Sequence, residues 1–226
     1  MISYSQLPFI EQSILTLSAL VLLSSFALLA QSRVIATIKT FAWQGLLLSL
    51  GTILVAADTG EHHLYFSAVL TLALKVVFIP WLLIRQSRKL GILREFDTVI
   101  RPGILLIAAS AMVIFCYSVV QPIEPFAAGV TRDAIALSLS VVMLSMLMLI
   151  TRRKAITQVV AFMSLENGLF FSAITTTHGM PMIVELGVAF DVLVAAIIFG
   201  IFFFHIRESI ESLDIGQLNR LSEADE

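Results

Sequence analysis

Long, nearly uncharged apolar stretches recur along the whole chain, and they restrict its fold more than any other feature. Each stretch spans about 18 to 22 residues, which as a helix crosses a hydrocarbon layer of about 30 Å. Only 13% of the residues are charged, against about 25% in soluble domains. The runs are also too continuous for barrel strands, in which apolar and polar residues alternate. The sequence therefore predicts an all-α polytopic membrane protein.

We expect about seven transmembrane helices in the chain. They are predicted near residues 10–30, 34–56, 64–85, 103–120, 133–151, 155–177 and 181–205. The opening "MISYSQLPFIEQS" has no positively charged region, so we do not interpret it as a cleaved signal peptide. We divide the chain into N-terminal membrane helices (1–132), a three-helix unit (133–206) and a polar cytoplasmic tail (207–226).

The distribution of cations predicts an orientation with the N-terminus outside and the C-terminus inside. In this orientation the cytoplasmic loops and ends hold Arg33, Lys39, Arg85, Arg88, Lys89, Arg94, Arg101, Arg152, Arg153, Lys154, Arg207 and Arg220. The outer loops hold Arg132 and several acidic residues. Because Lys and Arg are enriched on the cytoplasmic side of membrane proteins, these loops indicate topology and not nucleic-acid binding. The single Cys116 can form no internal disulfide.

The two halves of the chain show a weak internal similarity. Segment 34–48, "VIATIKTFAWQGLLL", aligns with part of 155–171, "AITQVVAFMSLENGLFF", and this alignment matches Gln44 with Asn167. The third predicted span then corresponds to the seventh. Because an even number of spans separates the partners, the sequence predicts a parallel repeat of two three-helix units, an architecture that transporters use.

Three ionisable residues, Lys75, Glu166 and Asp191, lie near the middle of predicted spans. Glu166 follows Lys154 by 12 residues, or about 18 Å of helix. A lone charge at this depth costs about 2.5 to 3.5 kcal/mol, so we expect these side chains to face the protein interior and one another. Groups poised between charged and neutral forms can exchange protons, and we predict a proton relay. A static ion pair that fixes helix register is the structural alternative.

Two further residues are weaker candidates. Glu185 is placed near the outer surface, where it could line an entrance, and His205 ends the last predicted helix on the cytoplasmic side, where it could pass protons. No His, Cys or Asp set has the spacing of a metal or iron–sulfur site, and no Gly-rich phosphate loop or nucleophile motif is present. We therefore predict no metal, no cofactor and no catalytic residue in this chain.

Several segments in order resemble a known family. They are "LALKVVFIPWL", "RRKAITQVVAFMSLENGLFFSAI", "IVELGVAFDVLVAAIIFGIFFFHIRESI" and "SLDIGQLNRL". They look like component E of hydrogenase-4, a membrane subunit of formate-hydrogenlyase-type nickel–iron hydrogenases. The last three helices are similar to the K subunit of respiratory complex I and the C subunit of multisubunit cation/proton antiporters. The resemblance implies that Glu166 in "LENG" takes part in proton translocation, together with a second acid at Asp191 or Glu185.

The resemblance implies a non-catalytic membrane subunit of an oxidoreductase complex in the bacterial inner membrane. Its expected partners are other membrane subunits and peripheral subunits that carry the redox centres, together with the lipid bilayer. Two alternatives remain open from the residues. One is an ion-coupled transporter, acting alone or as part of a multisubunit antiporter, and the other is a passive membrane scaffold. The residues also leave open whether the ion is H⁺ or Na⁺.

Overall fold

The computed structural model describes residues 8–60, 62–89, 102–123, 129–177, 187, 189–194, 196, 197 and 200. This part of the chain is helical apart from short connections and contains no strand. Six of its helices are long and apolar enough to cross a membrane. The prediction of an all-α polytopic membrane protein is therefore confirmed. Most of the predicted seventh span, 181–205, and the whole tail, 207–226, lie outside the described residues.

The helices begin and end close to the predicted positions. Their bounds are α1 Phe9–Ala30, α2 Val34–Thr59, α3 His62–Thr71, the π-helix η2 Leu72–Phe78, α4 Ile79–Lys89, α5 Pro102–Val120, the 3₁₀ turn η3 Gln121–Ile123, α6 Gly129–Thr151 and α7 Ala155–Thr177. Together α3, η2 and α4 form one membrane-spanning segment, His62–Lys89. Predicted and observed bounds differ by no more than about one helical turn.

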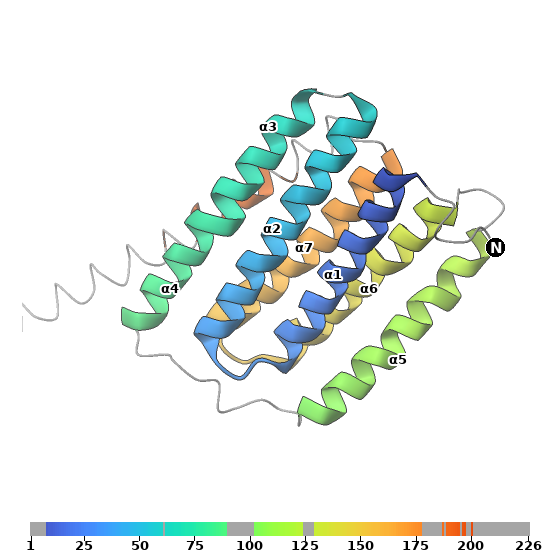
Figure 1. The fold of residues 1–226 in the computed structure, drawn as a ribbon. Helices are drawn as coiled ribbons and strands as arrows, with labels where there is room; N and C mark the ends of the chain where they lie inside the picture. The colour runs from blue at the N-terminus through green and yellow to red at the C-terminus, as the bar shows by residue number, and fades with distance from the viewer. Residues whose placement is uncertain are drawn as a thin grey trace, which may run out of the picture.

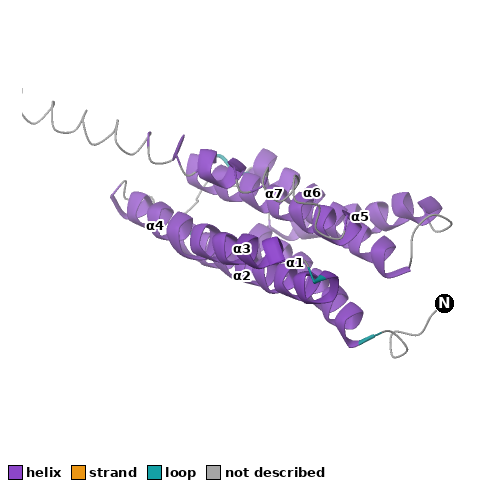
Figure 2. Cartoon of the chain, turned by 90° about the horizontal axis from the view of Figure 1, so that it is seen from above, coloured by secondary structure: helices purple, strands orange, loops and turns teal. Residues whose placement is uncertain are grey.

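The helices are arranged in two layers (Figures 1 and 2). One layer contains α1 to α4 and the other α5 to α7, with α1 packed against α6 and α2 against α7 across the interface. Figure 1 also shows that α1 and α6 run in the same direction, as do α2 and α7. The helices that the predicted repeat would pair thus lie side by side. The repeat itself and the orientation across the membrane stay predictions.

Apolar side chains cover both the inside and the outside of the bundle. The core between the layers includes Leu28, Ile38, Phe41, Leu144 and Val160, all buried. Many large apolar residues are exposed instead, among them Phe66, Ile107 and Ile150, which are more than two-thirds exposed. In water such a surface would be unfavourable, but in a bilayer these side chains face lipid tails. The exposure pattern therefore agrees with a membrane environment.

Two glycines allow close helix packing between α7 and its neighbours. A Cβ atom on Gly168 would lie 3.0 Å from side-chain atoms of Val141 and Val142 and 3.1 Å from a backbone oxygen of Ser138 on α6. A Cβ atom on Gly51 of α2 would lie 2.8 Å from the ring of Phe171. Small residues at such contacts let membrane helices approach without a clash. This packing fixes α7, which carries Glu166, against α6 of its own layer and α2 of the other layer.

Arg152 joins the two layers at the end of α1. Its side chain is buried, and Nη2 donates hydrogen bonds to the carbonyl oxygens of Leu29 at 2.8 Å and Gln31 at 2.6 Å. The last carbonyls of a helix have no partner within the helix, and the negative end of the helix dipole attracts a cation. Arg152, which directly follows α6, therefore caps α1, in addition to its part in the predicted topology.

Candidate functional site

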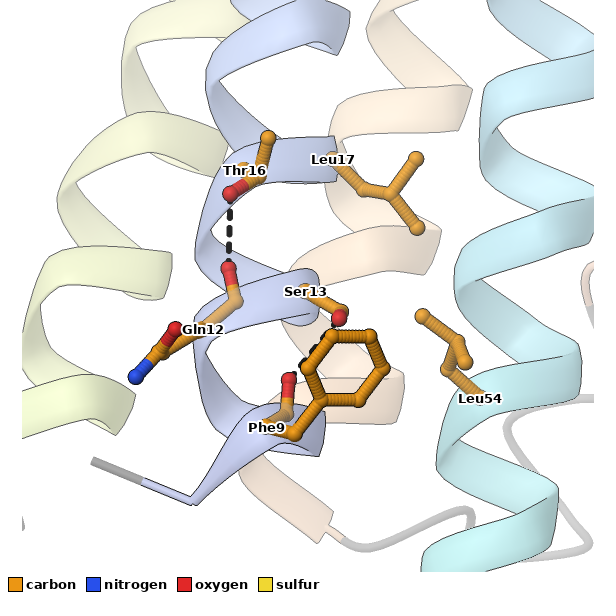
Figure 3. A pocket seen from close by; sticks show the side chains of 6 residues that line it. All are labelled: Phe9, Gln12, Ser13, Thr16, Leu17 and Leu54. Atoms are coloured by element: carbon orange, nitrogen blue, oxygen red, sulfur yellow. Dashed lines mark hydrogen bonds between the residues drawn. The ribbon is translucent and has the colours of Figure 1, made fainter. Parts of the chain in front are cut away.

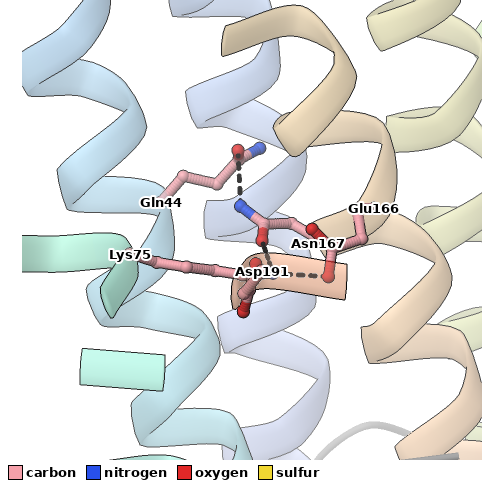
Figure 4. A network of polar contacts seen from close by, with 5 residues as sticks. All are labelled: Gln44, Lys75, Glu166, Asn167 and Asp191. Carbon is pink, nitrogen blue, oxygen red and sulfur yellow. Dashed lines mark hydrogen bonds and ion pairs between the residues drawn. The ribbon is translucent and has the colours of Figure 1, made fainter. Parts of the chain in front are cut away.

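Lys75 lies at the centre of a buried polar cluster (Figure 4). Its Nζ atom donates a hydrogen bond to Asn167 Oδ1 at 2.9 Å. The same nitrogen lies 3.0 Å from Glu166 Oε1 and 3.1 Å from Asp191 Oδ1. Lys75 comes from η2, Glu166 and Asn167 from α7, and Asp191 from the helical residues 189–194. The structure thus brings together the three ionisable residues that the sequence singled out.

The three ionisable side chains of the cluster are almost entirely buried. The exposed fractions are 1% for Lys75, 8% for Glu166 and 2% for Asp191. With all three groups ionised, one cation faces two anions, and the cluster carries a net charge of −1. An uncompensated charge at mid-membrane depth costs about 2.5 to 3.5 kcal/mol. Binding one additional proton would make the cluster electrically neutral.

A chain of neutral polar groups holds Lys75 from the α2 side. Asn167 Nδ2 donates to Gln44 Oε1 at 3.2 Å, and Gln44 Nε2 donates to Ser25 Oγ on α1 at 2.9 Å. All three side chains are buried. Because Asn167 Nδ2 is committed to Gln44, its oxygen is presented to the lysine. The sequence matched Gln44 with Asn167 in the predicted repeat, but neither was predicted to belong to the site. The feature that could have identified them is an amide side chain inside an otherwise apolar span.

The π-helix η2 sets the position of Lys75. The N–H group of Ile79 bonds to the carbonyl oxygen of Leu74, five residues earlier, where an α-helix would use the fourth. Pro80 follows directly and has no N–H group to donate, which favours an altered bonding pattern here. Opposite Lys75 stands Gly45 of α2, where an added Cβ would lie 3.2 Å from the lysine Cβ. Glycine therefore lets the lysine backbone approach α2 closely. The apolar sequence of this span had not indicated a π-helix.

The remaining predicted candidates, Glu185 and His205, lie outside the described residues, so their part in the site stays a prediction. Among the described residues no group of His, Cys, Asp or Glu has the arrangement of a metal site. The assignment of Lys75, Glu166 and Asp191 to a proton relay stays a prediction, because the distances show that the side chains are close together and do not show proton transfer.

A separate cavity lies at the start of α1, beside α2 (Figure 3). Its volume is about 350 Å³, and its lining residues are Phe9, Gln12, Ser13, Thr16, Leu17 and Leu54. The hydroxyl groups of Ser13 and Thr16 donate to carbonyl oxygens of their own helix, at 2.8 and 2.7 Å. None of the six lining side chains is ionisable, so this cavity offers no group for proton exchange.

Comparison with known proteins identifies relatives along most of the chain. Hydrogenase-4 component E of Escherichia coli strain K12 is 25% identical over 207 residues, which cover 91% of this chain and 95% of that protein. Component E of Shigella flexneri matches with the same identity and coverage. An uncharacterized protein of Mycobacterium tuberculosis is 29% identical over 187 residues, covering 82% of this chain and 85% of that protein. No family model and no solved structure matches the chain. The resemblance inferred from the sequence is confirmed by these relatives.

Proposed function

We propose that this chain, a homologue of hydrogenase-4 component E, is a membrane subunit of a hydrogenase-type redox complex and contributes a proton-exchange site to it. The relatives over nine-tenths of the chain support the complex. The buried cluster supports the proton exchange, and one observation carries it: a lysine ammonium lies within 3.1 Å of two buried carboxylates. We place the protein in the bacterial inner membrane, with membrane and peripheral hydrogenase subunits as its partners.

The mechanism moves one proton among three groups without changing their total charge. With one additional proton bound on Glu166, the cluster contains one neutral carboxyl group, the carboxylate of Asp191 and the ammonium of Lys75. Lys75 can give a proton to Asp191 and take one from Glu166, because its Nζ atom lies about 3 Å from both. The result is a proton displaced from one side of the lysine to the other. Neutral Asn167 holds the lysine in place during both steps.

Coupling to redox chemistry requires only moderate energies. A bias of one pKa unit on a group corresponds to about 1.4 kcal/mol. Moving one charge against a potential of 100 mV costs about 2.3 kcal/mol. A conformational change in a partner subunit that shifts the proton affinity of the cluster by about two pKa units therefore supplies enough energy for one charge. The redox reaction itself would take place in the partners.

The experiment that tests this function replaces Glu166 in the assembled complex. In inverted membrane vesicles we expect Glu166→Gln to keep hydrogen production and to reduce proton translocation, followed with a pH-sensitive dye, by about tenfold or more. Asp58→Asn is the matched control, since Asp58 is exposed at the end of α2. If Glu166→Gln leaves translocation unchanged, the chain is a scaffold. If the tagged protein purifies from mild detergent without any partner, a stand-alone transporter is favoured.

A further inference from the structure

An apolar cavity lies against Glu166. Its volume is about 430 Å³, within the range of small-molecule sites. It lies between α7 and the helical residues 187 and 189–194, and its lining includes Phe162, Leu165, Leu169, Phe170, Phe190 and Glu166. Leu169 and Phe190 are exposed on the apolar surface of the bundle. The mouth of the cavity therefore faces lipid, and an ionisable side chain forms part of its wall.

Phenylalanine rings line this cavity together with Glu166. The rings of Phe162 and Phe190 form a tilted pair with centroids 5.6 Å apart. On the other side, the ring of Phe170 fills the space that a side chain at Gly187 would take, because an added Cβ there would lie 2.9 Å from Phe170 Cδ2. Phe170 already lies 5.8 Å from the ammonium of Lys75. Aromatic faces attract cations, and more strongly in a dry site.

The carboxyl group of Glu166 has unused capacity to accept hydrogen bonds. Its Oε1 atom pairs electrostatically with Lys75, while Oε2 is buried and receives no hydrogen bond from the described residues. A buried polar atom without a partner is unfavourable by about 1 to 3 kcal/mol. A ligand donor placed in the cavity would satisfy this atom. Together with the excess negative charge of the cluster, this favours a ligand with a positively charged donor group.

We propose that this cavity binds lipophilic amines that enter from the membrane. The inference rests on the proposed function in one respect: the proton that the cluster binds is the proton that the amine takes. A neutral amine dissolves in lipid and enters past Leu169 and Phe190. The O–H bond of the protonated Glu166 carboxyl breaks and an N–H bond forms, which leaves an ammonium–carboxylate pair with no change in total charge. The apolar body of the amine packs on the phenylalanine rings.

The depth of the site separates such amines from lipid headgroups. Glu166 is 12 residues from Lys154 at the start of its helix, about 18 Å along the axis. An aminophospholipid keeps its amine at the interface, about 15 Å from the bilayer centre. Only an amine that is soluble in the hydrocarbon layer reaches the carboxyl group. By exchanging a mobile proton for a bound cation, it would block proton exchange at Glu166.

The probe is isotope-labelled 2-phenylethylamine, with 2-phenylethanol as the neutral control of the same shape. The full-length chain is placed in phosphatidylcholine nanodiscs and equilibrium binding is measured. We expect the unmodified chain to bind the amine saturably. Its affinity for the alcohol, and the affinity of Glu166→Gln for the amine, should both be lower by about tenfold or more. Leu169→Trp, at the lipid-facing mouth, should weaken binding to a similar extent while leaving Glu166 intact. Glu11→Gln, on α1, should bind like the unmodified protein.

The inference is overturned if amine binding does not saturate, or if the alcohol binds the unmodified chain as tightly as the amine does. It is also overturned if the amine binds Glu166→Gln as tightly as it binds the unmodified chain. Its failure is distinct from failure of the proposed function. No saturable binding, together with loss of proton translocation in Glu166→Gln, removes only the amine site. Binding that depends on Glu166, together with unchanged translocation in Glu166→Gln, removes the proton function and leaves the ligand site.

Discussion

Replacing Lys75 by methionine tests the charge balance of the cluster most directly. Methionine keeps an unbranched chain of similar length, so the close packing against Gly45 is retained. What the substitution removes is the cation between Glu166 and Asp191. With one proton bound, the unmodified cluster is neutral, whereas the variant carries −1. A buried pair that loses one partner is destabilised by about 3 to 5 kcal/mol. We expect Lys75→Met to lower the free energy of unfolding by about 3 kcal/mol.

A second substitution returns the missing charge balance. In Lys75→Met/Asp191→Asn a single carboxyl group remains, and one bound proton again makes the cluster neutral. We therefore expect the double variant to recover about 2 kcal/mol relative to Lys75→Met, a coupling typical of residues in contact. Asp191→Asn alone leaves the Lys75–Glu166 pair and should lie within about 1 kcal/mol of the unmodified protein.

Unfolding of all four proteins is followed by far-UV circular dichroism during SDS titration in mixed micelles at neutral pH. The order of stability matters more than each value. If Lys75→Met unfolds at the same SDS fraction as the unmodified protein, the lysine does not compensate buried charge. If the double variant is no more stable than Lys75→Met, the net charge of the cluster does not govern its stability. The cluster then has no need of an additional proton for neutrality.

Two further predictions concern the packing that holds the cluster. Arg152→Leu should lower the free energy of unfolding by about 3 kcal/mol, because it leaves the last carbonyls of α1 without a charged donor; Arg153→Leu, at the exposed neighbour, should change it by less than about 0.5 kcal/mol in the same titration. Gly168→Ala should lower it by about 1 to 3 kcal/mol, because its Cβ would lie 3.0 Å from two valines of α6. Gly103→Ala meets nothing within 4 Å and should be neutral or slightly stabilising. Equal effects within either pair would contradict the packing described.

The spans were predictable because a bilayer imposes one length scale on every helix. A segment that crosses the hydrocarbon layer forms its backbone hydrogen bonds within itself and has to be apolar over about 20 residues. Charged residues or turns mark its ends. The start of α2 at Val34 and the end of α7 at Thr177 follow from this rule. The ionisable cluster was predictable for a related reason, since a charge in this medium must find a partner. Lys75, Glu166 and Asp191 could therefore be expected to meet without knowledge of the packing.

The rest of the site depends on how each helix is rotated about its own axis, which hydropathy does not indicate. When all faces of a span are apolar, the sequence gives little indication of which face points inward. The contacts of Gln44 with Asn167 and of Asn167 with Lys75 were therefore not predictable. The π-helix escaped prediction because its sequence, "LALKVVF", is an ordinary apolar run. Likewise, the capping of α1 by Arg152 required two segments more than 120 residues apart to be placed together.

The neutral side of the cluster limits the direction from which a proton can reach it. In the chain from Ser25 through Gln44 to Asn167, each amide nitrogen donates and each amide oxygen accepts. An amide group can pass a proton only by becoming protonated or by changing to its imidic acid form, and both are unfavourable at neutral pH. This chain can therefore orient Lys75 but cannot conduct protons to it. In the proposed function, exchange with water would then take place through Glu166 or Asp191, on the side formed by α7 and the helical residues 189–194. That side also contains the apolar cavity, so a ligand bound there and a proton moving through the cluster would compete for the same carboxyl group.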